Sequence, residues 1–203
     1  VYQGDLAGGG GRANRDGDNK KGGYYHEPEF VHMVERTQTA ANPEPLRREH
    51  ISQGLTSYYT SFELGGVHFA LMEDRKFKSF PSRLGPLEKY GSKIMNEGYD
   101  GRDADLPDGQ ILGEQQEAFL RDWIRSTDGV RVAFTQTLFA SLHTAPSGKM
   151  WLDVDAGGWP QTPRNRALDI LIEGDVLLLA GDTHLPAVVQ HGVRDFRDSV
   201  WQF

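Results

Sequence analysis

Short apolar runs with the length of buried strands recur along the chain. The runs at 130–135 and 176–180 are bounded by glycine or polar residues, which predicts a strand at each. Two earlier segments, 56–64 and 67–73, are rich in aromatic and β-favouring residues and are separated by Gly65-Gly66. Two strands joined by a pair of glycines predict a β-hairpin.

Other segments carry apolar residues at helical spacing. The first runs from Pro28 to the break at Asn42-Pro43, the second covers 112–124, and the third begins at Thr162, a predicted N-cap, followed by Pro163. The residues predicted to face inward are Phe30, Val31, Val34, Phe119, Leu120, Trp123, Ile124, Ala167, Leu168, Leu171 and Ile172.

The predicted elements alternate between strand and helix. With further antiparallel strands around 187–190 and 199–203, the order from residue 56 is hairpin, helix, strand, helix, strand, hairpin. This order predicts a layered α/β domain with a mixed sheet. Length favours a single domain over 1–203, with a Gly-rich loop at 1–23 and a long loop excursion at 79–110.

Composition narrows the functional classes. A hydrophobic content of 37% is typical of a globular protein, and no apolar run is long enough to span a membrane. A net charge of -7 argues against a nucleic-acid-binding surface, because phosphate backbones require clustered Lys and Arg. The absence of cysteine excludes thiol catalysis, thiolate metal sites and disulfides.

A carboxylate and an imidazole follow the predicted strand at 176–180. Asp182 and His184 are two residues apart, so in extended backbone their side chains point the same way, beyond the carboxyl end of the strand. Ligands of open α/β sheets bind at that end, and Asp with His suits a divalent metal. The alternative is a strand-end turn in which Asp182 caps a loop and His184 lies on the surface.

Polar residues also follow the other two predicted strands. After the strand at 130–135 come Gln136, Ser141 and His143, where the histidine either ligates a metal, shuttles protons or is merely a loop residue. Ser141 and His143 do not establish a hydrolase triad, since there is no nucleophile elbow. After the hairpin, Arg75 lies in a charged cluster that is either a solvated strand end or an anion-binding site, because guanidinium suits phosphoryl oxygens.

Five segments together resemble a known family. They are Val1-Tyr-Gln-Gly4, the run at 66–78, Leu112-Gly-Glu-Gln-Gln-Glu117, the run at 158–166, and Gly181-Asp-Thr-His-Leu-Pro-Ala187. In this order they resemble the PhoD-like alkaline phosphatase/phosphodiesterase branch of the calcineurin-like metallophosphoesterases. The resemblance implies a partial calcineurin-like fold, with mixed β-sheet layers flanked by helices and metals at strand ends.

The resemblance also implies roles for individual residues. Asp182 and His184 become metal ligands with Gln136 as a further candidate, while Arg75 and His143 become catalytic candidates. The ions implied are divalent or trivalent, either calcium and iron or zinc and manganese. They would activate water to attack the phosphorus of a small phosphoester substrate. Export from the cytoplasm is also typical of such proteins.

The chain departs from the family pattern at its start. The Asp-Asp-His-Asp box of the family would stand just before Val1, so the chain is expected to be a fragment, with little activity by itself. Two rival functions remain open. One is a non-catalytic α/β binding domain in which Asp182 and His184 form a structural turn. The other is a metal-free hydrolase that uses Ser141 and His143.

Overall fold

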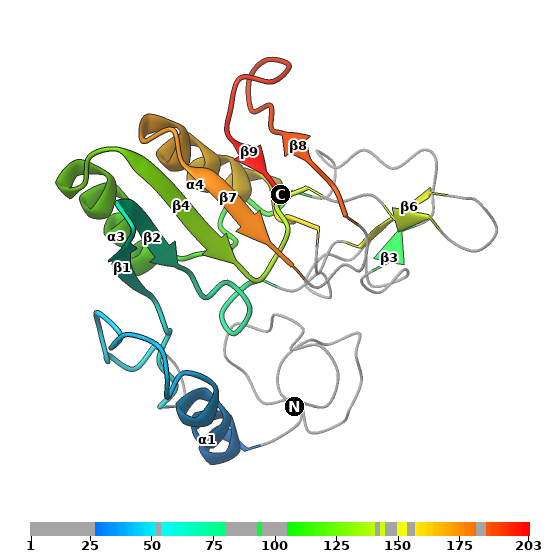
Figure 1. The fold of residues 1–203 in the computed structure, drawn as a ribbon. Helices are drawn as coiled ribbons and strands as arrows, with labels where there is room; N and C mark the ends of the chain where they lie inside the picture. The colour runs from blue at the N-terminus through cyan, green and yellow to red at the C-terminus, as the bar shows by residue number, and fades with distance from the viewer. Residues whose placement is uncertain are drawn as a thin grey trace.

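The computed structural model describes residues 27–51, 54–79, 93–94, 105–140, 143–144, 150–153, 157–181 and 186–203, with backbone alone at 93–94, 143–144 and 150–153. Its main sheet has six strands in the order β1-β2-β4-β7-β9-β8 (Figure 1). These strands are Thr60–Leu64 (β1), Val67–Leu71 (β2), Val130–Thr135 (β4), Leu177–Ala180 (β7), Val189–Gln190 (β8) and Trp201–Gln202 (β9).

The main sheet is mixed, as the sequence predicts. The four inner strands, β2, β4, β7 and β9, run parallel to one another. The edge strands β1 and β8 pair antiparallel with β2 and β9. The hairpin between β1 and β2 is confirmed. Its turn uses Gly65 and Gly66 at φ values of 61° and 78°, a left-handed conformation that glycine adopts without steric cost.

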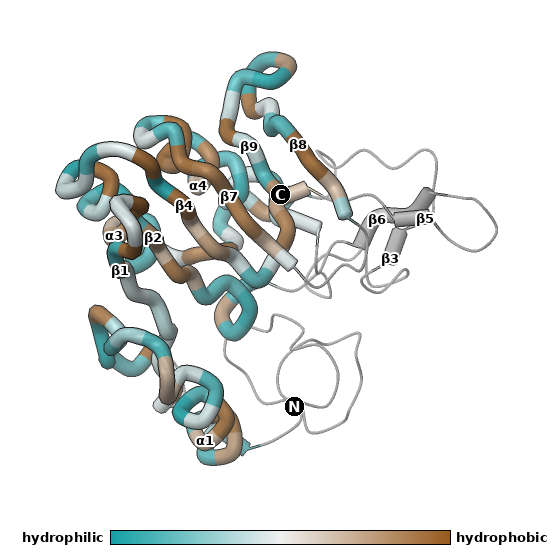
Figure 2. The backbone as a smooth tube through the Cα atoms, in the orientation of Figure 1, coloured by the Kyte–Doolittle hydropathy of each residue, from teal (hydrophilic) through white to brown (hydrophobic). Residues whose placement is uncertain are grey.

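Two helices cover one face of this sheet. Helices α3 (Glu114–Ser126) and α4 (Gln161–Glu173) pack against each other, and their buried residues join those of β2, β4 and β7 in one core. Figure 2 shows hydrophobic residues concentrated along β4 and β7 in the middle of the sheet. The core residues of the two helices are Leu120, Trp123, Ile124, Ala167, Leu168, Ile170 and Leu171.

Helix α4 differs from its prediction in two places. It begins at Gln161 with Pro160 as N-cap, so Thr162 lies inside the first turn. Asp105 supplies the missing cap, because its Oδ1 accepts a hydrogen bond from the Thr162 backbone N–H at 2.9 Å. Ile172, predicted to face inward, is 38% exposed, since Ile170 and Leu171 occupy the face that packs on the sheet.

Helix α1 (Pro28–Gln38) is shorter than predicted. Thr39 leaves the helical conformation at φ −101° and ψ 2°, four residues before Pro43. The buried residues of α1 are Val31 and Val34, so the rest of the predicted helix would have had no apolar face to bury.

A second, three-stranded sheet has the order β3-β6-β5, formed by Lys93–Ile94 (β3), Met150–Asp153 (β6) and His143–Thr144 (β5). Among the described residues of the predicted loop excursion at 79–110, Lys93–Ile94 form strand β3, which pairs antiparallel with β6. None of the helices in the described ranges is long and apolar enough to cross a membrane.

Candidate functional site at the carboxyl edge of the sheet

The carboxyl ends of β2, β4 and β7 meet at one edge of the main sheet (Figure 1). Leu71 pairs with Phe134, and Thr135 pairs with Ala180. The segments that begin at residues 72, 136 and 181 therefore leave the sheet next to one another, since neighbouring strands lie about 4.8 Å apart. This is the edge where open α/β sheets bind their ligands.

Two of the predicted site residues lie at this edge within the described ranges. Arg75 belongs to the segment after β2, and Gln136 is the first residue after β4. Asp182, His184 and Ser141 lie outside the described residues. His143 is part of β5, where the backbone alone is described. The sheet register still places Gln136 and Gly181 one residue beyond the paired Thr135 and Ala180.

A buried carboxylate joins the first two of these segments. Asp74 has no exposed surface, and its Oδ1 accepts hydrogen bonds from the backbone N–H groups of Gln136 at 3.0 Å and Thr137 at 3.1 Å. Its Oδ2 accepts from the Thr137 N–H at 3.0 Å. Asp74 therefore fixes the backbone that carries Gln136 to the segment that carries Arg75.

The electrostatics of Asp74 reflect its burial. Desolvation raises the pKa of this carboxyl group from 3.8 to about 6, because a charged carboxylate is disfavoured away from water. The N–H groups of Thr137 and Gln136 and the positive charge of Arg75 act in the opposite direction, while the charge of Glu73 adds to the increase. Asp74 is thus a costly group to bury.

The neighbouring carboxylate shapes its own segment. Oε1 of Glu73 accepts hydrogen bonds from the backbone N–H groups of Arg75 at 3.0 Å and Lys76 at 2.8 Å. Its Oε2 lies 3.4 Å from the Lys76 ammonium, and the Ser57 hydroxyl donates to it at 3.5 Å. Glu73 therefore holds the turn from which Arg75 projects.

The main chain of Glu73 is in turn held by helix α3. The side-chain amide of Gln116 accepts the Glu73 N–H at 2.9 Å and donates to the Glu73 carbonyl at 2.6 Å. It also donates to the Leu112 carbonyl at 2.8 Å. With 2% of its surface exposed, Gln116 satisfies buried backbone groups that water cannot reach.

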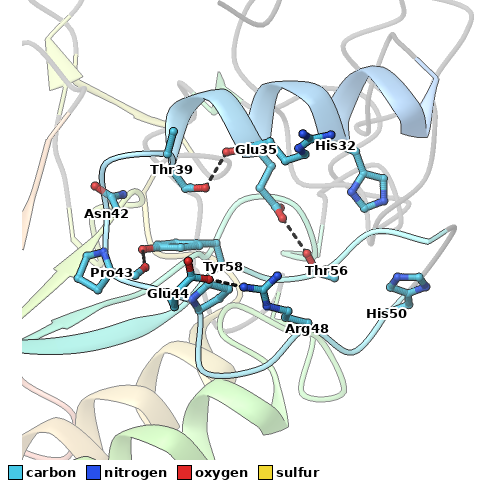
Figure 3. A pocket seen from close by; sticks show the side chains of 13 residues that line it. His32, Glu35, Thr39, Asn42, Pro43, Glu44, Arg48, His50, Thr56 and Tyr58 are labelled. Carbon is cyan, nitrogen blue, oxygen red and sulfur yellow. Dashed lines mark hydrogen bonds and ion pairs between the residues drawn. The ribbon is translucent and has the colours of Figure 1, made fainter.

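A pocket of about 410 Å³ lies beneath helix α1 (Figure 3), and two of its lining residues contact the segment after β2. The Lys76 ammonium forms an ion pair with Glu35 and donates to the Thr56 carbonyl at 2.6 Å. The Thr56 hydroxyl donates to Glu35 at 2.7 Å. The pocket is lined by His32, Glu35, Arg36, Thr39, Ala40, Asn42, Pro43, Glu44, Pro45, Arg48, His50, Thr56 and Tyr58.

The charges of this pocket are largely balanced among themselves. Glu35 is neutralised by Lys76, and Arg48 forms an ion pair with Glu44 at the rim. The Glu35–Lys76 pair therefore serves mainly to attach α1 to the segment after β2.

Strand β9 supports the opposite side of the edge. The Gln202 side chain, fully buried, accepts the Phe139 N–H at 2.8 Å and donates to the Ala140 carbonyl at 3.2 Å. His191 Nε2 lies 3.2 Å from the same Gln202 oxygen. The pKa of His191 is lowered from 6.5 to about 4, mainly by burial; the Arg164 charge acts in the same direction, and the Gln202 hydrogen bond acts against it.

The described side chains at this edge do not by themselves form a metal site. Within the described ranges no three Asp, Glu or His side chains come together to hold a metal. Both oxygens of Asp74 and Oε1 of Glu73 accept backbone N–H groups, and Oε2 of Glu73 faces Ser57 and Lys76. The Gln136 side chain, in contrast, is exposed. Gln136 is an exposed oxygen donor at this edge, and Gly181, which precedes Asp182 in the sequence, leaves the sheet beside it.

Sequence reasoning gave no role to Glu73, Asp74, Gln116 or Gln202. One of them carried a signal. Gln116 precedes Leu120 by four residues and so lies on the apolar face of its helix, a spacing that indicates a buried polar group. Glu73 and Asp74 had none, because a charged cluster after a strand has the same pattern as a solvated strand end.

The fold is that of an α/β protein whose parallel strands end in polar segments at one edge of the sheet. The model of the PhoD-like phosphatase family matches residues 15–202, so the chain belongs to the PhoD-like phosphatase family. No curated protein matches the chain.

A solved structure titled "Structure of PhoD" is similar, with a TM-score of 0.51 and 19% sequence identity. The match covers 82% of this chain and 31% of that chain, so the present chain spans less than a third of its length. At this identity the likeness shows the fold. The expected α/β architecture and the family resemblance are thereby confirmed.

Proposed function

We propose that this chain forms part of a metal-dependent hydrolase of small phosphoesters, a phosphatase or phosphodiesterase. The family match over residues 15–202 carries the proposal, because it supports a phosphoesterase function. The geometry adds support of a different kind. The segments of Arg75 and Gln136 meet at the edge where β7 ends, and Asp182 is the second residue after β7 in the sequence.

The residues take the following roles in the proposal. Gln136, Asp182 and His184 would hold metal ions, either calcium and iron or zinc and manganese. When bound, such ions supply Lewis-acid charge at phosphoryl oxygens and lower the pKa of a water molecule. The Arg75 guanidinium would donate hydrogen bonds to the phosphoryl oxygens, and His143 would hold or move a proton.

The test uses the natural full-length protein that contains this chain. Hydrolysis of 4-nitrophenyl phosphate and bis(4-nitrophenyl) phosphate is measured after chelation and again with calcium, iron, zinc or manganese restored. We expect activity that chelator removes and at least one metal restores, and that an Asp182→Ala/His184→Ala double variant lacks. Activity retained by the double variant would show that Asp182 and His184 are not the metal ligands.

The same assay separates the rival functions. A non-catalytic binding domain predicts no hydrolysis under any condition. A metal-free hydrolase predicts activity that survives chelation and disappears in Ser141→Ala.

A further inference from the structure

Two consecutive carboxylates after β2 each bind the backbone of a different loop. Glu73 accepts the N–H groups of its own segment, at Arg75 and Lys76, while Asp74 accepts those of the neighbouring segment, at Gln136 and Thr137. Both side chains are buried, with 7% and 0% of their surface exposed. We propose that Glu73 and Asp74 are positioning residues, with Glu73 orienting Arg75 and Asp74 orienting Gln136. This inference rests on the proposed function, because Arg75 and Gln136 take their roles from it.

In these hydrogen bonds the backbone N–H groups donate and the carboxylates accept. A carboxylate that accepts two backbone N–H groups fixes the φ and ψ angles of the residues between them, and so aims the side chains they bear. Gln136 and Thr137 lie just past the last paired residue of β4, where the sheet no longer restrains them. Asp74 restrains them there in its place, so the Gln136 backbone is held while its side chain stays exposed.

The arrangement is more than a general reinforcement of the edge. Gln116 binds both the N–H and the carbonyl of Glu73, so the dipeptide is attached to helix α3 as well as to the two loops. A buried carboxylate is an expensive way to stabilise a fold, since neutral groups could accept the same hydrogen bonds. The two carboxylates therefore need a reason other than stability, and the orientation of Arg75 and Gln136 provides one.

The two carboxylates should therefore affect different measurable quantities. Removing Asp74 loosens Gln136 and should weaken metal binding, by about 10- to 100-fold as for other groups that orient a metal ligand. Removing Glu73 loosens Arg75 and should raise KM and the inhibition constant of inorganic phosphate by about tenfold, the loss of one charge-assisted contact. Each variant should shift its own quantity more than the other, because the two carboxylates accept the N–H groups of different loops.

The experiment compares Asp74→Ala and Glu73→Ala in the natural full-length protein. Calcium and manganese affinities are measured by isothermal titration on chelator-treated protein, which needs no turnover. KM and phosphate inhibition are measured with 4-nitrophenyl phosphate. Asp198→Ala is the matched control, because Asp198 accepts three backbone N–H groups in the turn between β8 and β9, away from the edge.

Conservative variants add a second readout. Asp74→Asn and Glu73→Gln each keep one accepting oxygen, so they should recover most of the lost metal affinity or phosphate binding. If an alanine variant does not fold, the serine variant at the same position replaces it, since serine also removes the carboxylate but leaves a small polar side chain.

The outcomes are distinct. A shift in metal affinity in Asp74→Ala and in phosphate binding in Glu73→Ala supports the proposal. Equal shifts of both quantities in both variants, or shifts no larger than those of Asp198→Ala, overturn it. Absence of hydrolysis by the wild type would count against the proposed function instead, and the titrations would still decide whether Asp74 supports a metal site.

Discussion

Acidification should weaken the fold through His191, which lies in the turn between β8 and β9. Its side chain is 4% exposed, and burial lowers its pKa from 6.5 to about 4. Between these two values the unfolded chain binds a proton at this histidine and the folded protein does not. The free energy of unfolding therefore falls as the pH decreases from about 6.5 towards 4.

The size of the effect follows from the two pKa values. One pKa unit corresponds to about 1.4 kcal/mol, so the difference amounts to about 3 kcal/mol below pH 4 and about 2 kcal/mol at pH 5. Asp74 acts in the opposite direction, because its pKa is raised to about 6 and the folded protein binds its proton more tightly. Between pH 7 and pH 5, Asp74 offsets about 1 kcal/mol of the stability lost through His191. The pH dependence of the wild-type stability alone would therefore not reveal the contribution of His191.

A variant isolates the histidine. Urea denaturation, followed by tryptophan fluorescence, gives the free energy of unfolding of the wild type and of His191→Gln at pH 7 and pH 5. The stability of the wild type relative to the variant should fall by about 2 kcal/mol between the two pH values. The exposed His50, changed to Gln, is the control. A difference that stays constant within about 0.5 kcal/mol would refute the reasoning, because His191 would then titrate alike in both states.

Three further predictions concern stability. Gln116→Leu leaves the Glu73 N–H and carbonyl buried without a partner and should cost about 2 kcal/mol in urea denaturation; a cost near zero would contradict the anchoring role. Gly158→Ala would place a Cβ 2.1 Å from a backbone oxygen of the loop after β4 and should prevent stable folding. Gly65→Ala, also at positive φ but in open space, should lower the stability by only about 1 kcal/mol, and equal losses in thermal melts would contradict the steric argument. Asp105→Ala removes the cap of α4 and should cost about 1 kcal/mol by the same melts, whereas an unchanged melting temperature would show that the cap is dispensable.

Local patterns were sufficient where the structure depends on neighbouring residues. The hairpin followed from Gly65-Gly66, and the inward face of α3 followed from the spacing of Leu120, Trp123 and Ile124. The alternation of strand and helix also predicted a mixed sheet, and in the structure its parallel strands bring the segments of Arg75 and Gln136 to one edge.

The remainder depended on contacts between distant parts of the chain. The partners of Asp74 lie 62 and 63 residues away in sequence, and no periodicity reports such a contact. The start of α4 was misplaced for the same reason, since Asp105 caps it from 57 residues away. The roles of all five candidate site residues remain predictions, and the side chains of Asp182, His184 and His143 are not among those described.

The pairing of the central strands has a consequence for the order of folding. Val67 pairs with Val130, and Val132 pairs with Leu177, so each central contact must close a long loop, whereas β1 and β2 are joined by a tight turn. Loop closure opposes such contacts until much of the chain has collapsed, which makes folding slow and places the hairpin early. Asp74 binds Gln136 across the β2–β4 pair, so we expect this edge to be completed late. A protein trapped before that step would have the hairpin but not the contact between the two loops.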